Sequence, residues 1–320
     1  MVAMTTSAPP GSEPLTTAIS ISVVICCYTA DRRAGLAAAV TAALAQLDDR
    51  DELIVVVDGN ELLLHDLTAS YRHRVTVMAN THRRGLSGAR NSGLRAASGN
   101  VVVFLDDDAM LRCAALDGVR NAFADPTVVA LGGAVHPDWH CGSAPSWFPP
   151  EFGWVVGCDY RGLPPDGDEI RNPIGAAMAV RRAELIEIGG FSDRLGRIGA
   201  LPTGCEETLM GIALRRRDPQ ARILRRTAFA VSHAVTRERS TLSYFVRRCF
   251  HEGRSKAVLT RLCGQRSSLE SERAYTTRIL PSGMWHARRH PLRMLALPIG
   301  LTVTTVGYLL GLIQNSSRGG

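Results

Sequence analysis

The chain has 320 residues, of which 45% are hydrophobic and 21% are charged, a balance that excludes a wholly disordered protein. Its 30 glycines and 16 prolines are close to average and exclude a collagen-like or low-complexity chain. The net charge of +7 is unevenly spread: residues 215–293 contain 19 basic and 5 acidic residues, whereas the rest of the chain has a net charge of −7. The basic block predicts contact with an anionic partner, such as phosphates, nucleic acid or a membrane surface.

The cysteine pattern and the N-terminal residues indicate the cellular compartment in which the protein resides. The eight cysteines include no Cys-x-x-Cys pair and fit no zinc-binding spacing, so we interpret them as reduced thiols of a cytosolic domain. Residues 1–18 are polar, contain three prolines and lack a basic start followed by an apolar stretch. We therefore predict a disordered tail over residues 1–18 and no signal peptide.

The first part of the chain alternates short apolar runs with helical patterns. Strands are predicted over residues 19–27, 52–57, 75–79 and 101–105, and helices over residues 33–47 and 88–98. This alternation predicts an α/β fold with a Rossmann-like, mostly parallel sheet flanked by helices on both faces. Ligands of such sheets bind beyond the carboxyl ends of the strands, where Asp58 and the run Asp106–Asp108 fall.

The second part is less regular. An irregular aromatic stretch follows a strand predicted over residues 129–134, and a long loop of this kind in a compact domain is usually functional. Beyond it we predict strands over residues 174–181, 223–226 and 228–232 and helices over residues 183–188, 206–217 and 242–261.

An uncharged segment of 19 residues, Leu295–Ile313, lies near the end of the chain. Its length suits a membrane-spanning helix, and Arg288, Arg289 and Arg293 before it favour a cytoplasmic start under the positive-inside rule. A helix lying in the membrane interface and a buried core helix remain alternatives. We expect residues 261–294 to be a basic linker and residues 314–320 a tail.

Three carboxylates, Asp106, Asp107 and Asp108, directly follow a predicted buried strand. Like charges this close repel one another, and a divalent ion such as Mg²⁺ or Mn²⁺ resolves that conflict with oxygen ligands. A diphosphate would fill the remaining coordination positions. The alternative is a solvated turn or a cluster at a helix N-terminus.

Taken together, the motifs of this chain resemble those of a family 2 glycosyltransferase of the GT-A fold. In chain order they are VVICCYTADR (residues 23–32), VVVDG (55–59), RRGLSGARNSGL (83–94), FLDDDA (104–109), NPIGAAMAVRR (172–182), GGF (189–191), GCEET (204–208) and the region of His233. The resemblance implies a GT-A domain over residues 19–260, with a nucleotide-binding half (19–133) and an acceptor half (134–260).

The resemblance assigns roles at the donor side. The implied nucleotide-sugar contacts are Thr29, Asp31, Asp58, Arg83, Gly85, Arg90, Asp106 and Asp107, with Asp58 at a uracil-type base and Asp107 in the variable middle position of the Asp-x-Asp pair. Gly175 and Ala176 match the loop that faces the donor sugar. The implied metal ligands are Asp106, Asp108 and His233.

The acceptor side carries the implied catalytic pair. Glu206 and Glu207 match an acidic pair that is usually Glu-Asp, and the second member is the catalytic base. Glu207 is one methylene longer than the usual Asp, and Leu209 stands where an acidic residue is common. Without the surrounding motifs, two acids at a helix start would simply complement the helix dipole.

Aromatic and basic side chains are candidates for binding the acceptor. Trp147 and Trp154 could stack on a sugar ring or belong to the core. Arg237, Arg239 and Arg247 could bind a phosphate of a lipid-linked acceptor or anionic lipid headgroups, or form a solvated surface.

The sequence thus favours a metal-dependent inverting glycosyltransferase at the cytoplasmic face of the cell membrane. It would move a sugar, from a UDP-sugar in our interpretation, to a hydroxyl group during polysaccharide, glycolipid or lipid-linked saccharide synthesis. The alternatives are a nucleotidyltransferase with a similar sheet, a nucleic-acid-binding protein and a sugar-binding protein that has lost catalysis. We expect no nucleic-acid partner, because no nucleic-acid motif accompanies the arginines. The donor sugar, the acceptor and the oligomeric state are not specified by the sequence.

Overall fold

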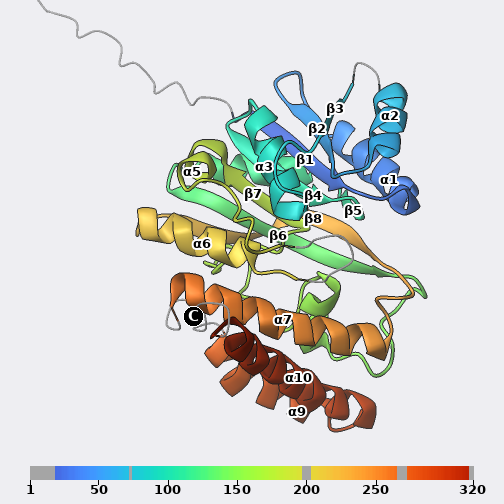
Figure 1. Cartoon of the computed structure of the whole chain (residues 1–320), viewed down its shortest axis with the longest axis vertical. Coiled ribbons are helices and arrows are strands. Elements are labelled where there is room, and N and C mark those ends of the chain that lie inside the picture. The colour runs from blue at the N-terminus through green and yellow to red at the C-terminus, as the bar shows by residue number, and fades with distance from the viewer. Residues whose placement is uncertain (1–18, 72–73, 197–202, 265–271, 317–320) are drawn as a thin grey trace, which may run out of the picture.

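The computed structural model describes residues 19–71, 74–196, 203–264 and 272–316. Within these residues, an eight-stranded sheet with the order β3-β2-β1-β4-β7-β6-β8-β5 forms the centre of the molecule (Figure 1). Its strands are β1 (Ile21–Cys27), β2 (Glu52–Val57), β3 (Thr76–Ala79), β4 (Val101–Asp106), β5 (Ala109–Leu111), β6 (Val128–Trp139), β7 (Ala177–Arg181) and β8 (Arg222–Val235).

Helices cover both faces of the sheet. The alternation of side chains along β1 shows the division: Val23 and Ile25 belong to one apolar cluster, and Val24 and Cys26 belong to another. The first cluster includes side chains of α1 (Arg33–Leu44), α2 (Glu61–Ser70) and α4 (Ala115–Phe123). The second includes side chains of α3 (Leu86–Ala96), α5 (Arg182–Glu187) and α6 (Glu206–Arg217). The prediction of a sheet between two helical layers is confirmed.

The strand directions differ in part from the prediction. Strands β1 to β4 pair in parallel, as does β6 with β8, but β7 runs antiparallel to both β4 and β6, and β5 runs antiparallel to β8. The sheet is therefore mixed. A strand buried on both faces is a continuous apolar run whichever way it points, so its sequence does not record its direction.

Several elements depart from their predicted bounds. The two short strands predicted over residues 223–232 are one strand, β8, whose pairing with β6 shifts register between Gly133 and Ala134. The polar stretch Arg225–Thr227 at this irregularity explains why the sequence suggested a break. The helices α2 and α4 were not predicted. The irregular aromatic stretch contains the helical turn η2 (Pro150–Val156), and η1 (Ala30–Arg32) precedes α1.

A layer of helices follows the sheet domain. Figure 1 shows α7 (Leu242–Cys263) lying between the sheet domain and the pair α9 (Leu280–Ala287) and α10 (Pro291–Ser316). In place of the linker expected over residues 261–294, α7 continues to Cys263, and the turn η3 (Tyr275–Ile279) leads into α9. Here Glu272 forms ion pairs with Arg171 at 2.7 Å and with Lys256 at 2.5 Å.

The helix predicted over Leu295–Ile313 lies within α10. Among the described residues, the segment Pro291–Ile313 is the one helix long and apolar enough to cross a membrane, with a mean hydropathy of 1.8. Of its most apolar window, 28% is buried inside the molecule, so one side of the helix has protein contacts and the rest is exposed. Residues 1–18 and 317–320 of the predicted tails lie outside the described residues.

Candidate metal and nucleotide-sugar site

Three carboxylates lie at the carboxyl end of β4. Asp106 ends this strand, and Asp107 and Asp108 form the turn into β5. The Asp106 side chain is 26% exposed, whereas Asp107 and Asp108 are buried. The fully apolar run before them fixes β4 in the core, so the chain leaves the sheet at this point with its acidic groups gathered at one edge.

His233 reaches the same edge from β8. The antiparallel pairing of Ala109 with His233 places the imidazole beside the acidic turn. Its Nε2 atom lies 3.0 Å from Oδ1 of Asp108 and 4.0 Å from Oδ2 of Asp106. One ligand atom from each of the three residues falls within 4.8 Å of the other two. The three predicted metal ligands therefore converge.

This trio fits a divalent ion. Both carboxylate oxygens of Asp108 are buried and accept no hydrogen bond among the described residues, although cationic side chains lie nearby. A buried acceptor without a hydrogen bond is costly, and coordination of a cation would satisfy it. Two carboxylates and one imidazole are a donor set that a divalent ion such as Mn²⁺ or Mg²⁺ can use.

Two arginines compensate the carboxylates. Arg32 lies 2.8 Å from Asp107 and 3.4 Å from Asp108, and Arg239 lies 3.1 Å from Asp108. Burial alone would raise the pKa of Asp108, but His233, Arg239 and Arg32 hold it well below its ordinary value. Burial raises the pKa of Asp107 to about 6 despite the opposing effect of Arg32. Asp108 is thus ionised and ready to bind a cation.

These arginines were not assigned this place from the sequence. Arg32 was quoted within a motif but given no role, and Arg239 was predicted to contact acceptor or phosphate. Arg239 is buried, and its Nη1 atom lies 3.5 Å from Nε2 of His233. One feature of the sequence points to the position of Arg239 beside the carboxylates. Arg239 follows His233 by six residues and lies just beyond the end of the strand that carries this histidine.

Arg90 connects the metal side of the site to the acidic start of α6. This side chain is fully buried, and it lies 3.0 Å from Oε1 of Glu207, 3.3 Å from Oε1 of Glu206 and 3.6 Å from Oδ1 of Asp106. Burial would lower the pKa of its guanidinium, but the three carboxylates raise it, so Arg90 stays charged. Arg90 therefore links both predicted catalytic acids to Asp106, one of the three predicted metal ligands.

Glu206 and Glu207 differ in access. They are the first two residues of α6, after Cys205 in a left-handed conformation with φ of 74°. The Glu206 side chain is 4% exposed and the Glu207 side chain 16%. Glu207 is therefore the acid that an incoming molecule can reach more easily.

Gly175 allows this arrangement. A Cβ atom at this position would lie 2.1 Å from Oε1 of Glu207 and 2.5 Å from Nη2 of Arg90, and Arg90 donates a hydrogen bond to the Gly175 carbonyl. Ala176, its predicted companion in the donor loop, is buried. The glycine is thus required by the side chains that approach it rather than by a backbone turn.

A pocket joins the carboxylates to Asp58. Its lining includes Cys26, Cys27, Tyr28, Arg32, Asp58, Leu86, Ala89, Asp106 and Asp107. Asp58 accepts hydrogen bonds from the Gly85 N–H and from the Asn80 side chain, so both of its oxygens are already engaged. This pocket has the position that the resemblance assigns to a nucleotide.

The other predicted nucleotide contacts differ in exposure: Asp31 and Arg83 are exposed, Thr29 is partly exposed, and Gly85 is buried. Thr29 caps η1 and hydrogen-bonds Asp31, whose side chain is exposed. Arg83 is exposed in the loop before α3, and Gly85 ends that loop with φ of 128°. Their contact with a nucleotide stays a prediction.

The predicted acceptor residues are more dispersed. Trp147 packs edge-on against Phe148 and Phe245, and Trp154 packs against Phe152, which favours the core alternative for both. Arg237 is exposed, and Arg247 is exposed and paired with Glu238 at 2.9 Å. Their contact with an acceptor stays a prediction.

Comparison with known proteins adds independent findings. The model of the glycosyl transferase family 2 matches residues 22–189 of this chain. A glucosyl-dolichyl phosphate glucuronosyltransferase of Haloferax volcanii is 32% identical over 252 residues, which cover 78% of this chain and 80% of that protein.

Two solved structures share the fold. A mannosyltransferase from Pyrobaculum calidifontis, PcManGT, in complex with GDP-Man and Mn²⁺, has a TM-score of 0.57 at 17% identity and covers 94% of this chain and 90% of its own. GalNAc-T7 with UDP, GalNAc and Mn²⁺ has a TM-score of 0.53 at 16% identity and covers 78% of this chain and 52% of its own. At this level of identity the likeness concerns the GT-A architecture.

Proposed function

The chain belongs to glycosyltransferase family 2, and from this premise we propose that it is a metal-dependent inverting enzyme acting on a lipid-linked acceptor. The donor is a nucleotide sugar, a UDP-sugar in our proposal, and the acceptor is a hydroxyl group of a lipid-linked saccharide. The observation that carries the proposal is the link through Arg90, which contacts both Asp106 of the candidate metal site and Glu207.

Asp106, Asp108 and His233 would hold the metal. When bound there, Mg²⁺ or Mn²⁺ supplies positive charge that neutralises the diphosphate as it leaves. Arg32 and Arg239 stand beside the same carboxylates, and their charge adds to the cationic environment of a diphosphate.

Glu207 is the proposed general base. Its carboxylate lies 3.0 Å from the Arg90 guanidinium and is the more exposed of the two acids, so an acceptor hydroxyl can reach it. As Glu207 takes the proton of the acceptor hydroxyl, the hydroxyl oxygen forms a bond to the anomeric carbon. The bond from that carbon to the diphosphate oxygen breaks on the opposite side, so the configuration inverts. Glu206, which is more deeply buried, positions Arg90.

The lipid-linked acceptor is supported by the relative and by the composition of the chain. The name of the Haloferax volcanii protein specifies glucosyl-dolichyl phosphate, and that protein aligns with most of this chain. The apolar helix α10 and the basic block over residues 215–293 suit an enzyme whose acceptor resides in a membrane. We propose that the catalytic domain acts at the cytoplasmic face.

The test is donor hydrolysis and transfer with purified full-length protein. UDP-glucuronate, UDP-glucose, UDP-galactose and GDP-mannose are each supplied with Mn²⁺, with Mg²⁺ or with EDTA, and nucleotide release is measured with and without a polyprenyl-phosphate glucose acceptor. We expect metal-dependent release from one UDP-sugar that the acceptor accelerates. Asp108→Asn should abolish it, whereas Asp117→Asn, a surface substitution on α4, should not. Absence of nucleotide binding with or without metal would refute the proposal.

A further inference from the structure

Helix α10 is fixed to the catalytic domain through its contact with α7. Glycines bring the two backbones together: a Cβ atom at Gly253 of α7 would lie 2.0 Å from the carbonyl oxygen of Thr304. A Cβ atom at Gly307 of α10 would lie 2.1 Å from the carbonyl oxygen of Phe250. Such close packing leaves no layer of lipid between the helices, so α10 must keep whatever orientation α7 has.

Helix α7 cannot follow α10 across a bilayer. Its inner side carries Arg248, Glu252 and Lys256, which form ion pairs at 2.7 and 3.2 Å, and Lys256 pairs further with Glu272. At 22 residues α7 is about 33 Å long, so it would fill the hydrocarbon core if α10 crossed upright beside it. The ion-pair network and the attached sheet domain would then have to enter the lipid. The observed packing therefore favours an α10 that lies along the membrane surface over one that spans the bilayer.

The outward side of α9 and α10 is apolar. Of the 13 large hydrophobic side chains that are exposed among the described residues, 11 lie between residues 284 and 313. They are Met284, Trp285, Leu292, Met294, Leu295, Ile299, Leu301, Val306, Leu309, Leu310 and Ile313. The spacing of positions 292, 295, 299, 306, 309 and 313 follows the helical period and gives one continuous stripe. An exposed apolar surface of this extent marks an interaction site.

The charge around this surface indicates its partner. Residues 273–316 contain no acidic residue, and Arg288 and Arg289 are exposed at the turn between α9 and α10. The guanidinium of Arg288 stacks on the Trp285 ring at 4.6 Å, a pairing of an aromatic ring and a cation that suits the boundary between lipid and water. An apolar stripe whose own segment, residues 273–316, carries basic and no acidic side chains complements anionic lipid.

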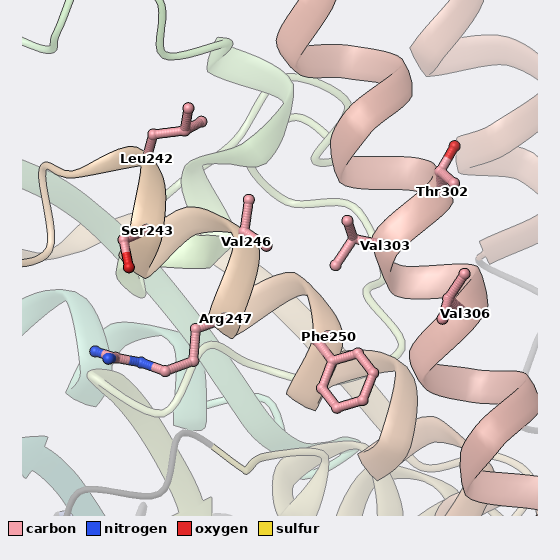
Figure 2. Close-up of a pocket in the computed structure, with 8 residues that line it drawn as sticks. All are labelled: Leu242, Ser243, Val246, Arg247, Phe250, Thr302, Val303 and Val306. Carbon is pink, nitrogen blue, oxygen red and sulfur yellow. The ribbon is translucent and has the colours of Figure 1, made fainter.

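A groove extends the apolar surface onto α7. Figure 2 shows Val246 and Phe250 of α7 on the side of Val303 and Val306 of α10, while Leu242 and Arg247 line the groove farther from α10. Leu242, at the start of α7, is three residues from Arg239, which pairs with Asp108 of the candidate metal site. The lipid-facing surface thus approaches the catalytic edge of the sheet.

We propose that α9 and α10 form a membrane-binding surface that lies in the plane of an anionic bilayer. The stripe on α10 enters the boundary between headgroups and acyl chains, Arg288 and Arg289 contact the headgroups, and the groove at Leu242 opens toward the lipid. The proposal concerns attachment and does not depend on which sugar the enzyme transfers.

Vesicle flotation with the full-length protein tests the attachment. We expect binding to vesicles of equal parts phosphatidylcholine and phosphatidylglycerol, and binding at least tenfold weaker to phosphatidylcholine alone. The double variant Leu295→Glu/Leu309→Glu should abolish flotation, and Arg288→Gln/Arg289→Gln should weaken only binding to the anionic vesicles. Leu62→Glu, which alters an exposed leucine of α2, is the matched control and should float as the parent does.

Two results would overturn this assignment. One is equal flotation of the parent and the Leu295→Glu/Leu309→Glu variant, with both shown to be folded by circular dichroism. The other is a stable dimer in size-exclusion chromatography that the same variant converts to a monomer, without vesicle binding by the parent, since a second copy would then cover the stripe.

Protease protection distinguishes an in-plane helix from a spanning one. Tags are placed at both ends of the full chain, and inverted membrane vesicles are treated with protease. Digestion of both tags from the same side is the expected result. Protection of the C-terminal tag alone would show that α10 crosses the bilayer and that the packing on α7 is lost in the membrane.

Discussion

The strands β1–β4 and the helices α7–α10 reach their structures in different ways. In β1, β2 and β4, largely apolar runs enter the core, and β2 and β4 end at Asp58 and at Asp106–Asp108, so sequence alone locates these strands and the acidic residues at their ends. In α7–α10, the positions of the helices depend on contacts between them. These contacts are the ion pairs of α7 and the close backbone approach that glycines allow between α7 and α10. The comparison shows that chemistry at strand ends is encoded locally, whereas attachment and orientation depend on contacts between distant segments.

Removing the base at the catalytic end should give the largest effect. Glu207→Gln keeps the shape of the side chain but cannot take a proton, so we expect kcat to fall by about 10² to 10⁴. Donor affinity should change little. The measurement is steady-state kinetics beside nucleotide-sugar titration, with the exposed Glu61→Gln of α2 as control. Loss of donor binding with kcat unchanged would assign Glu207 to the donor instead.

Removing Arg90 should destabilise the sheet domain. Arg90→Ala leaves the buried Glu206 and the partly buried Glu207 without their common cation, and breaking a buried ion pair costs about 3–5 kcal/mol in the free energy of unfolding. Urea unfolding monitored by circular dichroism measures this cost. Arg95→Ala, on the exposed side of α3, should shift the unfolding free energy by less than about 0.5 kcal/mol. If both variants lost a similar amount of unfolding free energy, the inference that the Arg90 ion pairs stabilise the sheet domain would be wrong.

A substitution that forces α7 and α10 apart should lower the free energy of unfolding by less than Arg90→Ala does. Gly307→Ala forces a Cβ atom against the Phe250 carbonyl, and we expect a cost of about 1–3 kcal/mol, with the catalytic site intact. Thr305→Ala, on the exposed side of the same helix, is the control. Thermal unfolding and donor hydrolysis in detergent solution are compared. Equal melting temperatures for the parent and Gly307→Ala would show that the helices are not in tight contact.

Acid should weaken the same helical layer slightly. Burial would raise the pKa of Glu272, but Lys256 and Arg171 lower it to about 2. A lowered folded-state pKa gives stability that is present above the ordinary value near 4.5 and is lost as pH falls from there toward 2. The difference between these two pKa values corresponds to at most about 3 kcal/mol, and solvent at this partly exposed side chain reduces it toward about 1 kcal/mol. Urea unfolding across that pH range measures the contribution. Glu272→Gln should have a shallower pH dependence, and an identical one would remove Glu272 from the acid response.

Much of the site could be predicted because its residues follow recognisable elements. The carboxylates after β4, the acids that begin α6 and His233 near the end of β8 were all located from the sequence, and three of them converge within 4.8 Å. The convergence itself could not be deduced, because it depends on the antiparallel pairing of β5 with β8, which joins segments more than 100 residues apart. Arg32 was missed as a partner of Asp107 for the same reason.

The features of the fold that could be predicted are those that leave a pattern of buried apolar residues in the sequence. The positions of β1–β4 and the two helical layers follow from apolar periodicity, but the strand order, the reversal of β7 and the helices α2 and α4 do not. Membership of glycosyltransferase family 2 decides against the nucleotidyltransferase and the nucleic-acid-binding alternatives.

The guanidinium of Arg90 has a consequence for anyone who wishes to re-engineer this enzyme. Because the Arg90 guanidinium contacts both Asp106 and Glu207, a substitution at either carboxylate changes the charge that balances the other. Substitutions at Asp106 and Glu207 will therefore be non-additive, and variants of this site should be selected as pairs of mutations rather than one position at a time.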